Sequence, residues 1–347
     1  MRLFAMLFWL MAFAAGPALA QAPGTPLQML ERRLTATAAE NPGEYGIAAL
    51  DLTNGRVVSV NGNIAFPMAS TVKVAVAATY LSEVDAGRRS MDDQIGGVSA
   101  ATLMNAMLTH SDNHATDQLL AMLGGPATVD LWLRAHGLQG IRVDRTIAQL
   151  LSDRRDLRDI RDSSTPIAML RLLQLIDSGR ALSAESHDRL LDMMSRCATG
   201  SNRIRALLPR GTRVEHKTGT LDGYTGDIAF VTLPDQRRIA MVLFARGGDN
   251  RPAVIATAAR AIYDAFNAET GMSGSAYAFQ GQQWPQASGP AMGLQSSSAT
   301  FTSSAQRAAS PEPGAGARID PLRSAPFLRR AAQPQASQPS GASAQGR

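Results

Sequence analysis

Two groups of strand-like segments lie far apart in this chain, and a long stretch with helical periodicity separates them. The five segments with strand patterns are 46–52, 56–60, 213–220, 227–233 and 238–245. The first two flank Asn54-Gly55 and the last two flank residues 234–237, and both connections favour hairpin turns. If strands from both ends of the chain pair in one sheet, the helical stretch between them forms an insertion within the sheet domain.

Helical periodicity predicts two terminal helices and a helical middle region. The terminal helices are expected at 26–39 and 252–267. The segments expected to be helical between the strand groups are 71–85, 99–109, 113–124, 127–136, 165–178 and 183–195. The predicted fold class is therefore α+β: a five-stranded antiparallel sheet flanked by the terminal helices, with an inserted all-helical lobe. The crevice between the sheet edge and this lobe is the expected place for a site.

The two ends of the chain differ in composition from the part between them. Residues 1–20 have Arg2, an apolar run and a final Ala18-Leu19-Ala20, the pattern of a secretory signal that is cleaved after residue 20. A membrane anchor is the alternative, but the apolar run is short for a span. We therefore expect one catalytic domain at 21–270 in the periplasm or outside the cell. Residues 271–347, rich in Ser, Ala, Gln, Gly and Pro, are expected to be a disordered tail.

Charge and cysteine content exclude several kinds of partner and site. The net charge is +5, but six arginines and only two acidic residues follow Thr270, so the domain itself is near neutral and no nucleic-acid partner is indicated. Cys197 is the only cysteine, which excludes an intramolecular disulfide and a cysteine-based metal site. The five histidines lack the spacing of a ligand set, so we expect no metal and no cofactor.

Three short motifs occur in order along the domain. They are S-x-x-K at 70–73, S-D-N at 111–113 and K-T-G at 217–219. Each is weak alone, because Ser70 and Ser111 could equally be helix caps. Together they form the set used by serine enzymes that are acylated by β-lactams.

The residue types in these motifs suit acyl transfer to a serine. A serine hydroxyl needs a base beside it, and Lys73, three positions on in a helix, can reach Ser70. Burial and the like charge of Lys217 both favour the neutral, basic form of Lys73. Ser111 is placed to relay the proton to the leaving nitrogen, and Asn113 can hydrogen-bond a substrate amide.

Longer stretches extend the similarity over nearly all of residues 25–268. They are HSDNHATDQLL, DRTIAQLLSDRRDLRDIRDSSTPIAML, CATGSNRIRALLPRGTRVEHKTGT and GDIAFV. These stretches resemble the class A serine β-lactamase family, which implies the serine β-lactamase and D,D-peptidase fold and a monomer.

The resemblance also implies roles for residues of the last motif and its surroundings. The backbone N–H groups of Ser70 and Thr220 would form the oxyanion hole. Lys217 and Thr218, next to Gly219 in the K-T-G strand, would hold the substrate carboxylate. Arg203 is a candidate for the same task, with an exposed surface arginine as the alternative.

One loop departs from the family pattern. Arg145 and Asp162 fit the ion pair that closes it, but Ile147 stands where the family has the glutamate that activates the hydrolytic water. Leu151 likewise stands where the family has a water-positioning asparagine, and no glutamate occurs between residues 144 and 162. Without that base, hydrolysis of the acyl-enzyme is expected to be slow.

Three acidic side chains of the same loop leave an alternative open. Asp153, Asp156 and Asp159 could each supply a substitute base, or could be solvated loop charges.

Three functions are compatible with this sequence. The first is a secreted β-lactamase-type hydrolase that is acylated by β-lactams and hydrolyses the adduct slowly. The second is a D,D-peptidase-like, penicillin-binding enzyme that acts on peptidoglycan stem peptides. The third is a non-catalytic binding protein with the same fold, against which the intact set of motif residues argues.

Overall fold

The computed structural model describes residues 25–154 and 156–268, so the expected signal and the tail after residue 270 lie outside the described part. No helix within these two ranges combines the length and the apolar character that crossing a membrane requires.

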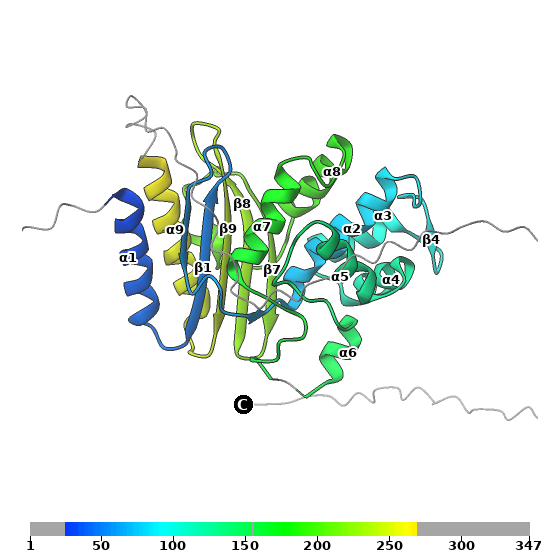
Figure 1. Cartoon of the computed structure of the whole chain (residues 1–347), viewed down its shortest axis with the longest axis horizontal. Helices are drawn as coiled ribbons and strands as arrows, with labels where there is room; N and C mark the ends of the chain where they lie inside the picture. The colour runs from blue at the N-terminus through cyan, green and yellow to red at the C-terminus, as the bar shows by residue number, and fades with distance from the viewer. Residues whose placement is uncertain (1–24, 155, 269–347) are drawn as a thin grey trace, which may run out of the picture. The chain divides into compact units, whose positions relative to one another are not determined.

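One antiparallel sheet of five strands forms the centre of the domain, with the strand order β2-β1-β9-β8-β7. The strands are β1 (Glu44–Asp51), β2 (Val57–Val60), β7 (Val214–Leu221), β8 (Tyr224–Thr232) and β9 (Arg238–Arg246). Both predicted hairpins form, and the late hairpin β8–β9 lies between β1 and β7. The strand that carries K-T-G is therefore an edge strand that faces the helical part of the chain (Figure 1).

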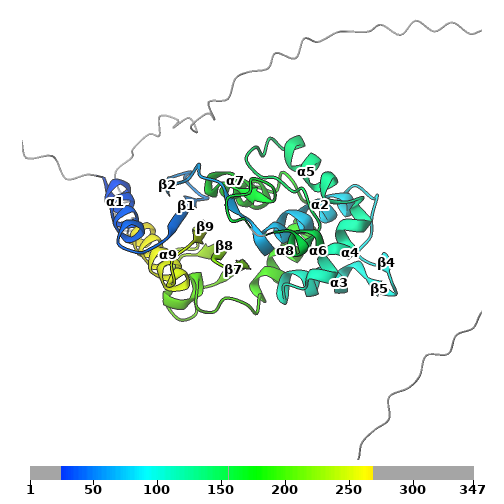
Figure 2. The same ribbon diagram turned by 90° about the horizontal axis from the view of Figure 1, so that it is seen from below.

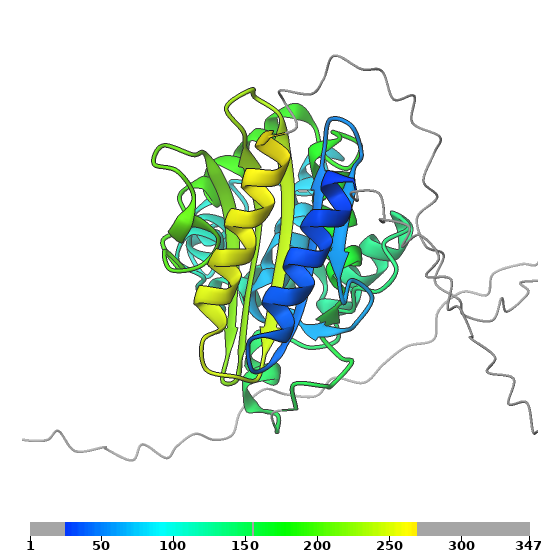
Figure 3. The ribbon, with the colours of Figure 1, turned by 90° about the vertical axis from the view of Figure 1, so that its left-hand side faces the viewer.

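The terminal helices cover one face of this sheet. α1 (Pro26–Ala39) and α9 (Arg251–Ala268) lie side by side across it (Figure 3). Thr25 caps α1 with a reciprocal capping box, and Pro26 occupies the first turn, where a missing N–H costs nothing. Buried Leu34 and Phe266 belong to the apolar core between these helices and the sheet.

The remaining helices lie on the other face and beyond it (Figure 2). They are α2 (Lys73–Asp85), α3 (Ala100–Thr109), α4 (Asn113–Leu123), α5 (Pro126–Ala135), α7 (Pro166–Asp177) and α8 (Ala184–Ser195). α7 packs on β1 and β9, α8 packs on β7, and α2 to α5 form the lobe. The predicted α+β class is confirmed, and α2 is the helix that links the lobe to the sheet.

Short elements complete the connections. They are the 3₁₀ turns η1 (Ala69–Val72) and η2 (Ile204–Leu207) and the strand pairs β3 (Phe66–Pro67) with β6 (Ser163–Ser164) and β4 (Gln94–Ile95) with β5 (Val98–Ser99). A further helix, α6 (Ile147–Ser152), was not among the expected helices. Thr146 begins it with a second capping box, in which the Gln149 N–H donates to Thr146 Oγ1 and the Thr146 N–H donates to Gln149 Oε1.

Candidate active site

Ser70 lies in the turn η1, between the sheet and the lobe. A methyl group at Gly219 would come within 2.6 Å of the Met68 carbonyl oxygen and 3.2 Å of Ala69 Cβ, so β7 approaches η1 closely only because residue 219 has no side chain. The glycine of K-T-G thus brings the edge strand against the turn that carries Ser70.

Neither motif serine caps a helix. α2 begins at Lys73 without a side-chain cap, and the Lys73 N–H donates to the Ser70 carbonyl. In the second motif it is Asp112 that caps α4, through a 2.7 Å bond from the Ala115 N–H to its carboxylate. The capping alternatives for Ser70 and Ser111 are therefore wrong.

Lys73 is fully buried, and its amine is held by the second motif. Nζ donates to the Ser111 carbonyl at 2.7 Å, to Ser111 Oγ at 3.3 Å and to Asn113 Oδ1 at 2.7 Å. With Oδ1 engaged, the NH₂ group of Asn113 is left as the donor for a ligand.

Lys217 reaches the same serine from the sheet. Its Nζ donates to Ser111 Oγ at 2.9 Å and to the Thr218 carbonyl at 3.0 Å. Two amines from different elements therefore share one hydroxyl. Within residues 25–154 and 156–268, no hydrogen bond joins either amine to the half-buried Ser70 hydroxyl. Hydrogen bonds between catalytic groups often form only in the complex with substrate.

Burial makes both amines weaker bases than free lysine. Burial, reinforced by the charge of Lys217, lowers the pKa of Lys73 to about 7, although Asp112 and Asp117 oppose the shift. Burial also lowers the pKa of Lys217 to about 8, against the charges of Cys197 and Asp227. A lysine with a pKa near neutrality can both accept and return a proton.

Two of the described non-glycine residues with positive φ belong to the serine motifs or adjoin them. Ala69 has φ 46° and Ser111 has φ 60°, the left-handed region that residues with a Cβ rarely adopt. Strain of this kind persists where the surroundings enforce a particular side-chain direction. Here it orients the neighbours of Lys73.

Arg203 is not a surface residue. It is 9% exposed, and its guanidinium donates to the carbonyls of Gly219 at 3.1 Å and Gly226 at 2.8 Å and to Thr220 Oγ1 at 2.7 Å. The alternative of an exposed arginine is therefore wrong. Arg203 fixes the end of the K-T-G strand and holds the exposed Thr220 side chain.

The loop before β6 is closed by the expected ion pair. Arg145 Nε donates to Asp162 at 2.5 Å, and the guanidinium also pairs with Asp153 at 2.6 Å and Asp159 at 3.3 Å. Hydrogen bonds from Arg161 outweigh desolvation and lower the pKa of Asp159 to about 2. Asp153 and Asp159 are thus tied to arginines, which disfavours a role for either as a base.

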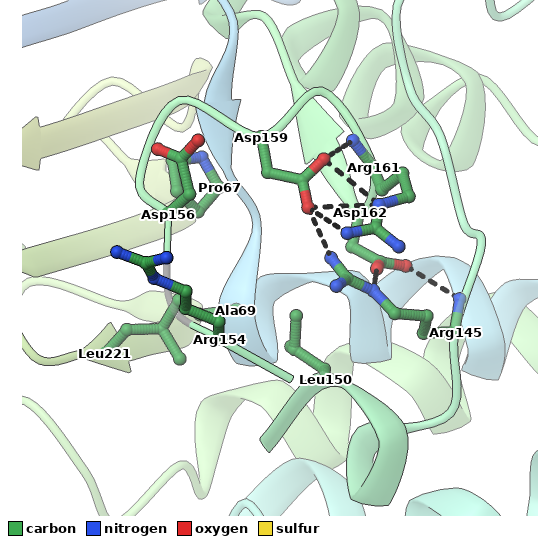
Figure 4. A pocket seen from close by; sticks show the side chains of 10 residues that line it. All are labelled: Pro67, Ala69, Arg145, Leu150, Arg154, Asp156, Asp159, Arg161, Asp162 and Leu221. Atoms are coloured by element: carbon green, nitrogen blue, oxygen red, sulfur yellow. Dashed lines mark hydrogen bonds and ion pairs between the residues drawn. The ribbon is translucent and has the colours of Figure 1, made fainter. Parts of the chain in front are cut away.

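A small cavity of about 30 Å³ lies between this loop and the turn of Ser70, large enough for one or two water molecules (Figure 4). Ala69 and Leu221 line one side, and Leu150 points into it from α6 (Figure 4). Leu151, expected at the water-positioning place, is 51% exposed and does not line it. Leu150, rather than Leu151, is the residue of α6 that lines this cavity. Asp156 also lines the cavity.

The sequence profile of the β-lactamase enzyme family matches residues 29–266, most of the chain. This chain belongs to the class A serine β-lactamase family. Its order of elements and its α+β fold are those of that family.

Class A enzymes of known sequence and structure share about a third of their residues with this chain. The carbapenem-hydrolyzing β-lactamase KPC of Klebsiella oxytoca is 31% identical over 283 residues, 74% of this chain and 94% of its own. The β-lactamase OXY-2 of the same organism is 29% identical and covers 67% of this chain and 88% of its own. An ancestral Gram-negative class A β-lactamase superposes with a TM-score of 0.66 at 34% identity, over 68% of this chain and 100% of its own.

The class A domain has a loop anchor that the sequence analysis missed. Asp117 on α4 accepts hydrogen bonds from the backbone N–H groups of Ile147 at 2.7 Å and Ala148 at 2.9 Å. Ile147 itself is buried. No local pattern reveals this contact, because thirty residues separate Asp117 from its partner. The described residues include no group of three or more His, Cys, Asp or Glu side chains that could hold a metal.

Arg145→Ala is expected to lower the free energy of unfolding by about 2–4 kcal/mol, because it leaves the buried Asp162 without its counter-ion. Arg142→Ala is the matched control, since Arg142 pairs with Asp144 but is 42% exposed and its loss should cost under about 1 kcal/mol. Urea unfolding of both variants measures the difference. Equal, small losses would show that the Arg145–Asp162 pair does not hold this loop.

Proposed function

We propose that β-lactams acylate this class A enzyme at Ser70 and that the acyl-enzyme is hydrolysed slowly. The observation that supports acylation best is the pair of buried amines on Ser111, with Lys73 poised near a pKa of 7. One turn separates Lys73 from the nucleophile, and Lys217 supplies positive charge at Ser111 Oγ.

The proposed reaction has a complete path for its proton. Neutral Lys73 takes the proton of Ser70 Oγ, which bonds to the lactam carbonyl carbon, while the N–H groups of Ser70 and Thr220 stabilise the oxyanion. The C–N bond then breaks, and the proton passes from Lys73 through Ser111 Oγ to the ring nitrogen. Lys217 and Thr218 bind the substrate carboxylate.

Slow hydrolysis is proposed from the chemistry of the loop. Ile147 takes the place of the family's glutamate and Leu150 lines the cavity beside Ser70, and neither side chain can activate a water. Asp153 and Asp159 are held by Arg145, and the pKa of about 2 makes Asp159 a poor base. Among the described aspartates that line the cavity, Asp156 is the one that makes no ion pair with Arg145. We place the mature enzyme in the periplasm or outside the cell, on the pattern of residues 1–20.

The lifetime of the adduct tests this proposal. The chain is mixed with a penicillin, and its intact mass is followed while the free drug is measured. An added mass that persists for many minutes supports slow hydrolysis, whereas rapid loss of the adduct with turnover of excess drug contradicts it. Release of the terminal D-alanine from a peptidoglycan stem peptide would instead favour the D,D-peptidase function, for which the missing glutamate is the supporting observation.

The rate constant of acylation at saturating penicillin is expected to rise about tenfold per pH unit from pH 5 and to level off above pH 7. The reason is that Lys73 acts as a base only when neutral, and its pKa is about 7. Rapid-quench measurements of adduct mass give this profile. A rate constant that does not change between pH 5 and pH 7 would exclude Lys73 as the base.

A further inference from the structure

A partly buried chain of polar side chains leads away from the proposed carboxylate site, and the acylation chemistry does not use it. Thr218 Oγ1 lies 2.5 Å from Thr199 Oγ1, which lies 3.3 Å from Cys197 Sγ. Thr218 stands opposite Asp227 in the sheet register and two residues from His216, so these three side chains share one face. That face is the one on which Val214 and Val231 join the core beneath the terminal helices, and the Ile204 N–H of η2 donates to Asp227 there.

Each hydrogen bond in this series of side chains can point in either direction. Both the Cys197–Thr199 and the Thr199–Thr218 contact allow either atom to be the donor. A hydroxyl has one proton, so each direction is fixed by the next group along. A thiol at Cys197 can donate to Thr199, which then donates to Thr218 and leaves the Thr218 proton for a ligand. A thiolate can only accept, so Thr199 and then Thr218 must turn their protons inward.

We propose that Cys197 and Thr199 are positioning residues for Thr218, and that the proton on Cys197 decides whether Thr218 donates a hydrogen bond to the carboxylate of the substrate. The inference rests on the proposed function, because it needs a substrate with a carboxylate beside Thr218. Binding of that carboxylate would favour the protonated thiol, so binding and proton uptake are coupled.

The charged surroundings make Cys197 able to switch near neutral pH. Burial alone raises the pKa of its thiol, but His216, Thr199 and Lys217 together lower it to about 6. Desolvation opposes the charge of His216, yet the Asp227 carboxylate 3.0 Å from its Nδ1 raises the pKa of His216 to about 9. Lys217, with a pKa of about 8, and the guanidinium of Arg203 are the other charged groups facing this thiol. The pKa values of His216 and Lys217 lie above pH 7, so Cys197 is the one of these three groups whose pKa lies between pH 5 and pH 7.

The test compares a penicillin with the methyl ester of the same penicillin, which has no carboxylate charge. The second-order rate constant of acylation is measured for both from pH 5 to pH 7, and their ratio cancels the titration of Lys73. In the full chain the ratio should fall about five- to tenfold, since a thiol of pKa 6 is about one-tenth protonated at pH 7. In Cys197→Ser, which keeps a proton throughout, and in Thr199→Val, which breaks the chain, the ratio should stay within about twofold.

Thr79→Val is the matched control, because it makes the same change at a threonine away from Thr218, and the Thr79 hydroxyl donates within α2, to the Ala75 carbonyl. It should keep the pH dependence of the parent chain. At pH 7 the Cys197→Ser ratio should exceed that of the parent, a gain that a merely structural cysteine would not give. A ratio that falls equally in the parent and in Cys197→Ser overturns the proposal.

A second measurement does not depend on acylation. Cys197 is the only cysteine, so the ultraviolet absorbance of its thiolate reports its titration directly. Thr199→Val removes a donor to the thiolate and should raise its pKa. An unchanged pKa of the Cys197 thiol in Thr199→Val would overturn the proposed series of hydrogen bonds. A raised pKa in a protein that forms no penicillin adduct would mean that these hydrogen bonds exist but that the proposed function is wrong.

Discussion

Lys73→Met is expected to slow the acylation of Ser70 by about 10²–10⁴-fold, the usual cost of losing a general base. The side chain of methionine fills a similar volume but can neither take the Ser70 proton nor pass one to Ser111. It also leaves the Ser111 carbonyl and Asn113 Oδ1 without the donor they have in the parent enzyme. Rapid mixing with a penicillin, followed by intact mass, measures the acylation rate.

Lys73→Arg tests whether acylation needs residue 73 as a base or only its positive charge. Arginine keeps a cation and several donors, but its pKa above about 12 prevents it from acting as a base. We expect Lys73→Arg to be as slow as Lys73→Met, with thermal unfolding used to confirm that both variants fold. Acylation by Lys73→Arg at close to the parent rate would place the base elsewhere.

Ile147→Glu combined with Leu150→Asn is expected to speed release of the acyl group by about 10²–10⁴-fold. The N–H of residue 147 donates to Asp117 at 2.7 Å, and the charge of Asp117 raises the pKa of Lys73. A carboxylate introduced at residue 147 would therefore also interact electrostatically with Lys73. Residue 150 lines the cavity beside Ser70, where an amide can hold a water for that carboxylate. The decay of the isolated penicilloyl adduct gives the release rate.

The neighbouring leucine provides the control for this pair. Ile147→Glu with Leu151→Asn makes the same chemical change, but residue 151 is 51% exposed and outside the cavity. We expect clearly slower release than with Asn at position 150. Equal rates in the two double variants would show that the position in the cavity does not matter, and no acceleration in either would contradict the assignment of Ile147 to the glutamate position.

Local sequence patterns predict most of the helices and strands of the fold. Asn54-Gly55 predicts the hairpin of β1 and β2, and Pro26 and Pro166 stand in the first turns of α1 and α7, as expected from their fixed φ. Helix α6 was within reach as well, because Thr146 and Gln149 have the spacing of a capping box.

Contacts between distant segments could not be predicted in this way. The burial of Arg203 depends on carbonyls of two strands, and the bond of Asp117 to α6 crosses thirty residues. Leu150 rather than Leu151 lines the cavity, and only the helical phase of α6 determines which of the two does so. The hydrogen bonds from Cys197 to Thr218 likewise exist only once the segment after α8 lies against β7.

The most direct test of this account is to find which residue carries the acyl group. The chain is quenched soon after mixing with a penicillin and digested, and the peptide with the mass of the intact drug added is sequenced by fragmentation. We predict that the added mass lies on Ser70 and that Ser70→Ala, which lacks the hydroxyl, carries none. An adduct at another residue, or one that survives in Ser70→Ala, would contradict the assignment of Ser70 as the nucleophile.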